Sequence, residues 1–234
     1  QRNSIKQYDG FVFLTKYMND KYNPLQKPYI VMEGSVDYKF KSQPKLTPSA
    51  SRIVMYAGAI EAEYGFDTLI KAFMELPLKD VELHIYGDGK FVKQLLAYQE
   101  QDARIKYKGV VSNEEIIKAE QQATLLVNPR LSNQELVKYS FPSKTTEYML
   151  SGTPVLTTKL CGIPEEYYSH LFTFEEESEQ GFRDKLLETL SLSSDELQLK
   201  GMTAQKFVLE NKSNIKQAQH IQHFFEEIIT NNRK

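Results

Sequence analysis

Short apolar runs closed by Gly or Pro alternate along this chain with longer amphipathic segments. The apolar runs cover residues 53–56, 83–86, 105–107, 124–127 and 154–157. Runs of this length, closed by turn residues, are typical of strands that are buried on both faces. The pattern therefore predicts five buried strands between residues 53 and 157.

The segments between these runs have helical periodicity. Phe66, Leu69, Ile70 and Phe73 follow the i, i+3, i+4, i+7 spacing of one buried helix face. Ser112 is the predicted N-cap of a helix over 113–121, and Glu115, three residues later, is its predicted capping-box partner. Strands that alternate with helices predict an α/β fold with a doubly wound parallel sheet and right-handed crossovers.

The region from about 178 to 230 has no strand pattern. It predicts two or three helices, with Gly201 or Asn211 as the break between them. These helices would follow the sheet as a C-terminal extension of the same domain.

The first forty residues form a separate unit in the pattern. A strand over 11–15, a helix over 16–22 and a strand over 29–32 precede a polar stretch with two prolines at 41–49, which predicts a linker. One strand–helix–strand unit cannot bury a core alone. We therefore expect residues 1–45 to be the remnant and linker of an upstream domain, and 46–234 a second domain; a chain that begins with Gln1 fits this expectation.

The composition and charge of the chain exclude several classes of function. Apolar residues make up 41% and charged residues 26% of the 234 residues, which predicts a packed globule. The net charge of −2 gives no electrostatic basis for non-specific nucleic-acid binding, so no nucleic-acid partner is expected. The single cysteine excludes an internal disulfide framework and a Cys-rich zinc site, and fits a reducing cytosol.

The richest chemistry lies after the strand predicted at 124–127. Pro142 suits the first position of a helix, because its fixed φ matches and its missing N–H needs no partner there. The amides of Ser143, Lys144 and Thr145 would then face an anion, and the lysine adds a full charge at the same place. In a parallel sheet this loop reaches the carboxyl edge, where ligands bind.

Glu147 lies on the same helix face, one turn after Ser143. A carboxylate at that distance from a phosphate site can accept hydrogen bonds from a ribose diol. The alternative is a surface glutamate paired with Lys144, a contact worth only about 0.2–0.5 kcal/mol. Likewise, Gly58 and Gly87 are explained by simple turns as well as by a close approach to a nucleotide.

An ordered series of short motifs resembles the donor-binding half of retaining glycosyltransferases of the GT-B fold, the group-one family. The matching segments are 11–15, 32–37, 56–58, 86–89, 108–111, 141–148 and 152–155. In that family the glutamate that matches Glu147 binds the nucleotide ribose, and the turn that contains Val110 lies beside the base. The loop at 162–166 resembles the one that faces the donor sugar.

The resemblance implies a Rossmann-like C-terminal domain that binds a nucleoside-diphosphate sugar for retaining hexosyl transfer to an acceptor hydroxyl. It also implies metal-independent chemistry without a cofactor, a missing N-terminal acceptor-binding domain, and a carbohydrate or glycolipid acceptor in bacterial surface polysaccharide synthesis. The expected location is the cytoplasm, with peripheral attachment to the inner membrane face left open. Together the arguments select nine candidate nucleotide-sugar-binding residues: Gly58, Gly87, Val110, Arg130, Tyr139, Pro142, Ser143, Lys144 and Glu147.

Two departures from the family pattern leave alternatives open. Tyr139 stands where the family has a first glutamate, and segment 59–65 carries two carboxylates where the family has diphosphate-binding cations. A leaving diphosphate needs counter-charge, and the available replacements are Arg130, Lys138 and Lys144. Arg130 and Lys144 are assigned as stabilisers of the leaving group, and no other catalytic residue is assigned. The alternatives are a non-catalytic nucleotide-binding module and a GT-B relative such as a sugar-nucleotide epimerase.

Overall fold

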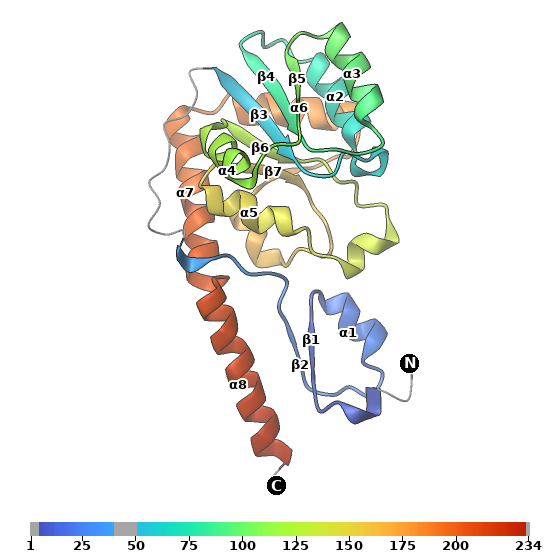
Figure 1. Ribbon diagram of the computed structural model, residues 1–234, viewed down its shortest axis with the longest axis vertical. Coiled ribbons are helices and arrows are strands. Elements are labelled where there is room, and N and C mark those ends of the chain that lie inside the picture. The colour runs from blue at the N-terminus through green and yellow to red at the C-terminus, as the bar shows by residue number, and fades with distance from the viewer. Residues whose placement is uncertain (1–4, 40–50, 233–234) are drawn as a thin grey trace.

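Six parallel strands form the main sheet of the computed structural model, which describes residues 5–39 and 51–232 (Figure 1). Their order is β5-β4-β3-β6-β7-β8. The chain therefore winds outward from β3 to β5, then returns to place β6 on the other side of β3. The strands are β3 (Arg52–Ala57), β4 (Val81–Tyr86), β5 (Ile105–Gly109), β6 (Leu125–Asn128), β7 (Val155–Thr158) and β8 (Phe172–Phe174).

This is the doubly wound, Rossmann-like sheet that the alternating pattern predicts, with all five predicted strands present. Along β3, Val54 and Tyr56 belong to one buried core, and Met55 and Ala57 belong to the other. Both faces of the strand are therefore covered, which explains its continuous apolar run. The three-residue strand β8 was not predicted.

Helices cover both faces of the sheet (Figure 1). The helices of this domain are α2 (Phe66–Met74), α3 (Val92–Gln101), α4 (Asn113–Gln122), α5 (Ser143–Ser151), α6 (Glu179–Leu190), α7 (Ser194–Asn211) and α8 (Asn214–Asn232). All four apolar residues predicted to line the inner face of α2 are fully buried. The capping box of α4 is confirmed: Ser112 Oγ accepts from the Glu115 amide at 3.3 Å, and Glu115 Oε2 accepts from the Ser112 amide at 3.0 Å.

Between residues 178 and 232 the structure has three helices, α6 to α8, as one of the predicted options had it. Asn211 ends α7, whereas Gly201 lies inside it, so the expectation of a break at Gly201 is wrong. A Cβ at Gly201 would collide with the carbonyl oxygen of Gly152, in the turn before β7. The glycine allows two backbones to approach closely rather than ending a helix.

The N-terminal residues form a two-stranded parallel unit beside the main domain (Figure 1). It comprises η1 (Ile5–Gln7), β1 (Phe11–Phe13), α1 (Lys16–Tyr22) and β2 (Tyr29–Val31). The first strand is shorter than expected because Thr15 is the N-cap of α1 and accepts from the Met18 amide at 3.3 Å. α8 runs alongside this unit, where Phe224 and Ile228 approach Gly10. The predicted linker at 41–49 and the domain boundary at 45/46 lie outside the described residues.

Candidate functional site

A pocket of about 210 Å³ opens at the carboxyl edge of the sheet. Its walls come from the loops that follow β3, β4 and β5, from one face of α4, and from the first turns of α5. Five of the nine candidate residues line it together: Gly58, Gly87, Val110, Lys144 and Glu147. These residues are up to 89 positions apart in the chain, and the parallel sheet brings them to one edge because the carboxyl ends of its strands meet there.

The two glycines form a floor without side chains. Gly58 and Gly87 have φ angles of 145° and 123°, which other residues rarely adopt. A Cβ on Gly58 would collide with Lys144 Nζ, and a Cβ on Gly87 would collide with the carbonyl oxygen of Gly58. The glycines therefore let the lysine lie directly against the backbone of the β3 loop.

The start of α5 differs from the prediction by one position. Pro142 is the N-cap residue, with φ −73° and ψ 99°, and the helix begins at Ser143. The amide of Thr145 donates to the Pro142 carbonyl at 2.8 Å, so it is not free to bind an anion as expected. A proline one position earlier still suits the start of the helix, because it has no N–H to be satisfied. Pro142 and Ser143 lie at this helix start, outside the lining of the pocket.

Lys144 is half-buried, with its Nζ 5.6 Å from the ring centre of Tyr56. Burial lowers the pKa of Lys144, while the carboxylates of Glu147 and Glu120 oppose that change. Glu147 is exposed at the open side of the pocket. The pocket thus presents one cation and one accessible carboxylate from successive turns of α5.

Glu120 is a pocket residue that the sequence reasoning missed. It lines the pocket from α4 together with Asn113 and Ile116, is only 1% exposed, and its Oε1 has no hydrogen-bond partner among the described residues. Burial, and then the charge of Glu147, raise its pKa to about 8. The signal was present in the sequence: Glu120 follows Ile116 by four positions and therefore lies on the inner face of the helix.

Arg130 lies near the pocket but does not line it. It follows β6, and its guanidinium lies 5.1 Å from the ring centre of Tyr64. Its Nε is buried and has no hydrogen-bond partner within residues 5–39 and 51–232. The charge of Arg130 also acts on Tyr56, where it opposes the rise in pKa that burial causes. Arg130 is thus held beside the β3 loop with a donor unused.

Tyr139 is placed against the N-terminal unit rather than in the pocket. It ends the short helix η4 (Glu135–Tyr139). Its ring lies 6.4 Å from that of Tyr22, and Lys21 Nζ lies 4.0 Å from its ring centre. The contact is extended by Thr15, whose hydroxyl donates to the carbonyl of Lys138 at 2.7 Å. The position that carries a glutamate in the resembling family thus joins α1 to η4 here.

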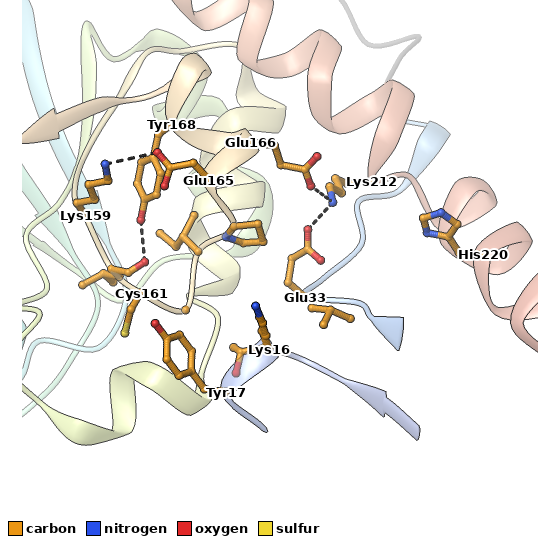
Figure 2. Close-up of a pocket in the computed structure, with 16 residues that line it drawn as sticks. Lys16, Tyr17, Glu33, Lys159, Cys161, Glu165, Glu166, Tyr168, Lys212 and His220 are labelled. Carbon is orange, nitrogen blue, oxygen red and sulfur yellow. Dashed lines mark hydrogen bonds and ion pairs between the residues drawn. The ribbon is translucent and has the colours of Figure 1, made fainter. Parts of the chain in front are cut away.

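A second and larger pocket, of about 710 Å³, lies between the N-terminal unit, the segment after β7 and the α7–α8 junction (Figure 2). Lys212 bridges Glu33 and Glu166, with 2.7 Å between its Nζ and the Glu166 Oε1. Tyr167 Oη donates to Glu33 Oε1 at 2.7 Å. Although burial lowers the pKa of Lys212, its hydrogen bonds to Glu166 and Glu33 outweigh that effect and raise it. These contacts join the segment that follows β2, the segment that follows β7 and the C-terminal end of α7.

Within residues 5–39 and 51–232, no helix combines the length and the apolar character that a membrane span requires. No group of three or more His, Cys, Asp or Glu side chains in those ranges is arranged to hold a metal ion.

Comparison with solved structures shows the same fold in several proteins. Anabaena HepE in complex with UDP has a TM-score of 0.77 and 16% identity, covering 96% of this chain and 66% of HepE. A point mutant of Staphylococcus aureus TarM, in complex with fondaparinux, alpha-GlcNAc-glycerol and UDP, has a TM-score of 0.74 and 17% identity, covering 96% and 44%. A glycosyltransferase from Rickettsia africae has a TM-score of 0.75 and 18% identity, covering 99% and 68%.

The chain thus spans only 44% to 66% of the length of TarM and HepE. A search of curated protein sequences gave no significant match. Residues 51–191, more than half of the chain, match the sequence profile of the family described as "Glycosyl transferases group 1". The chain therefore belongs to the group 1 glycosyl transferases.

Proposed function

We propose that this chain is the C-terminal, donor-binding half of a GT-B glycosyltransferase, and that its 210 Å³ pocket binds a nucleoside-diphosphate sugar. The observation that carries the proposal is the convergence of Gly58, Gly87, Val110, Lys144 and Glu147 on this one pocket. The glycine floor leaves room for a nucleotide to lie close to the protein backbone. The half-buried cation can pair with its diphosphate, and the accessible carboxylate can accept hydrogen bonds from its ribose. The UDP complexes of HepE and TarM, which share the fold, support this ligand class.

Lys144 is the group best placed to stabilise a leaving diphosphate. Its ammonium lies against the β3 loop and is partly removed from water, where a charge–charge interaction is stronger than in bulk solvent. Arg130 supplies a second cation near the same loop, with an unused Nε donor. Both residues lie outside segment 59–65, and their charges near the β3 loop would replace the cations that are missing from that segment. Transfer would then retain the configuration of the sugar, as in the enzymes that the sequence resembles.

The N-terminal unit fits the end of an acceptor-binding domain. Within the described residues its sheet has two strands, and such a sheet is marginal alone in water. Val12, Leu14 and Tyr29 are 43%, 46% and 37% exposed, which leaves apolar surface for further structure to cover. Upstream strands packed on this surface would complete the domain and present a carbohydrate or glycolipid acceptor to the donor.

Isothermal titration calorimetry with UDP, GDP, ADP and CMP tests the donor site. We expect binding of at least one nucleoside diphosphate. Glu147→Ala is expected to weaken it by roughly 1.5–3 kcal/mol, about tenfold to a hundredfold, through lost charge-assisted hydrogen bonds. The control is Glu100→Ala, which removes an exposed glutamate on α3, away from the pocket. Unchanged affinity in Glu147→Ala would refute the ribose assignment.

One observation favours a second candidate, a non-catalytic nucleotide-binding module. Tyr139, at the position of the family's first glutamate, contacts Tyr22 and Lys21 instead of the pocket. Supplying an upstream acceptor domain separates the two functions. Release of nucleotide from a bound nucleotide-sugar supports the transferase, whereas binding without release supports the module.

A further inference from the structure

Glu120 is a buried carboxyl group with an oxygen atom that no described protein group hydrogen-bonds. It is 1% exposed, and its Oε1 has no partner in the part of the chain that the structure describes. Buried polar atoms in folded proteins nearly always have a partner, and an exception calls for an explanation. Since Glu120 also lines the 210 Å³ pocket, a ligand in the pocket is the natural source of the missing hydrogen bond.

The protein groups around Glu120 do not supply that bond. Thr153 Oγ1 donates to the backbone carbonyl of Glu120 at 2.7 Å, not to its side chain. The hydroxyl of Tyr148 accepts from the Ala57 amide at 2.8 Å and donates to the Ala57 carbonyl at 3.2 Å. The remaining charged neighbours come from α5: the Glu147 carboxylate and the Lys144 ammonium.

Two carboxyl groups therefore face the same small space from different helices. Glu120 comes from α4 and Glu147 from α5, and each is close enough for its charge to act on Lys144. A diphosphate would be repelled by the charge of Glu147 and is better placed against Lys144 and the glycine floor. A vicinal diol brings two adjacent O–H donors and no charge, so it suits two carboxyl groups that line the same pocket from different helices.

We infer that Glu120 is a second ribose ligand, which together with Glu147 holds the two ribose hydroxyls and selects ribonucleotides over deoxyribonucleotides. This inference rests on the proposed function, because it requires a nucleotide in this pocket. The high pKa of Glu120 agrees with it: a carboxyl that keeps its proton near neutral pH can lie beside the charged Glu147 and still exchange hydrogen bonds with a hydroxyl.

The test measures binding of UDP, 2′-deoxy-UDP and 3′-deoxy-UDP by calorimetry. The variants are Glu120→Leu, which keeps the size of the side chain but removes its polar atoms, and Glu120→Gln, which keeps its hydrogen-bonding capacity. We expect the unmodified chain to bind UDP about tenfold or more tightly than at least one deoxy analogue. Glu120→Leu should remove the penalty for one analogue, Glu147→Ala should remove it for the other, and Glu120→Gln should restore most of the selectivity.

Several outcomes would overturn the inference, and they differ from a failure of the proposed function. If the unmodified chain binds UDP and both analogues equally, no ribose hydroxyl is held, and this result needs no variant to fold. If Glu120→Leu weakens all three ligands equally or leaves the selectivity intact, Glu120 does not touch the diol. In both cases, UDP binding that is weakened by Glu147→Ala would still support the proposed donor site. If the unmodified chain binds no nucleotide, both proposals fail together.

Discussion

Replacing Glu120 by leucine should stabilise the fold, and the gain should grow as the pH rises from about 5 to about 8. Burial and the nearby charge of Glu147 raise the pKa of Glu120 from 4.5 to about 8. Between these two pH values the folded protein keeps a proton that the unfolded chain has released. The free energy of unfolding of the unmodified protein therefore falls as the pH increases across this window, and the loss is complete above about pH 8.

The size of the effect follows from linkage. Each pH unit in which the folded state holds one extra proton lowers the free energy of unfolding by about 1.4 kcal/mol. Over the window from 4.5 to about 8, which is about 3.5 pH units, the upper limit is about 5 kcal/mol. Leucine carries no titratable group and fills a similar volume, so Glu120→Leu should lack this loss.

Urea unfolding at pH 5, 6, 7 and 8 measures the difference between the unmodified protein and Glu120→Leu. The same substitution at the exposed Glu100 of α3 serves as the control for replacing a glutamate by leucine away from the pocket. A stability difference that stays constant from pH 5 to pH 8 would refute the reasoning, because Glu120 would then be equally ionised in the folded and unfolded states.

Two further substitutions test the walls of the pocket. Gly58→Ala places a Cβ at a φ of 145° and against Lys144 Nζ, so we expect a loss of about 1–3 kcal/mol in urea unfolding together with weaker UDP binding; normal affinity in calorimetry would show that the lysine can move without consequence. Tyr148→Phe removes the buried hydroxyl that pairs with both backbone groups of Ala57 and should cost about 1–3 kcal/mol in the same assay, whereas a loss below about 0.5 kcal/mol would show that these groups find other partners.

Local chemistry was enough to predict much of the fold. The apolar runs gave the five long strands, because a strand buried on both faces needs apolar residues at successive positions, as in β3. The Ser112 and Glu115 capping box is complete within four residues, so nothing distant decides it. The glycines and α5 residues of the pocket were also found from local patterns, since a parallel sheet gathers its loops at one edge.

Other features depend on contacts between segments that are distant in the sequence. Glycine is a residue type that often ends a helix, yet α7 continues through Gly201. The glycine is needed there because the turn at Gly152 packs directly against it. Tyr139 could be assigned to a site by alignment alone, but the position of α1 places it against Tyr22. β8 is a strand only because β7 provides its partner.

Glu120 shows this division most clearly. By itself, the sequence determined that residue 120 is a glutamate on the inner face of an amphipathic helix. The tertiary structure decided that this carboxyl group is buried, that its Oε1 has no partner among the described residues, and that it lies near Glu147 and Lys144. Helical periodicity is set by neighbours within two turns, whereas desolvation and charge coupling depend on how α4 packs against α5.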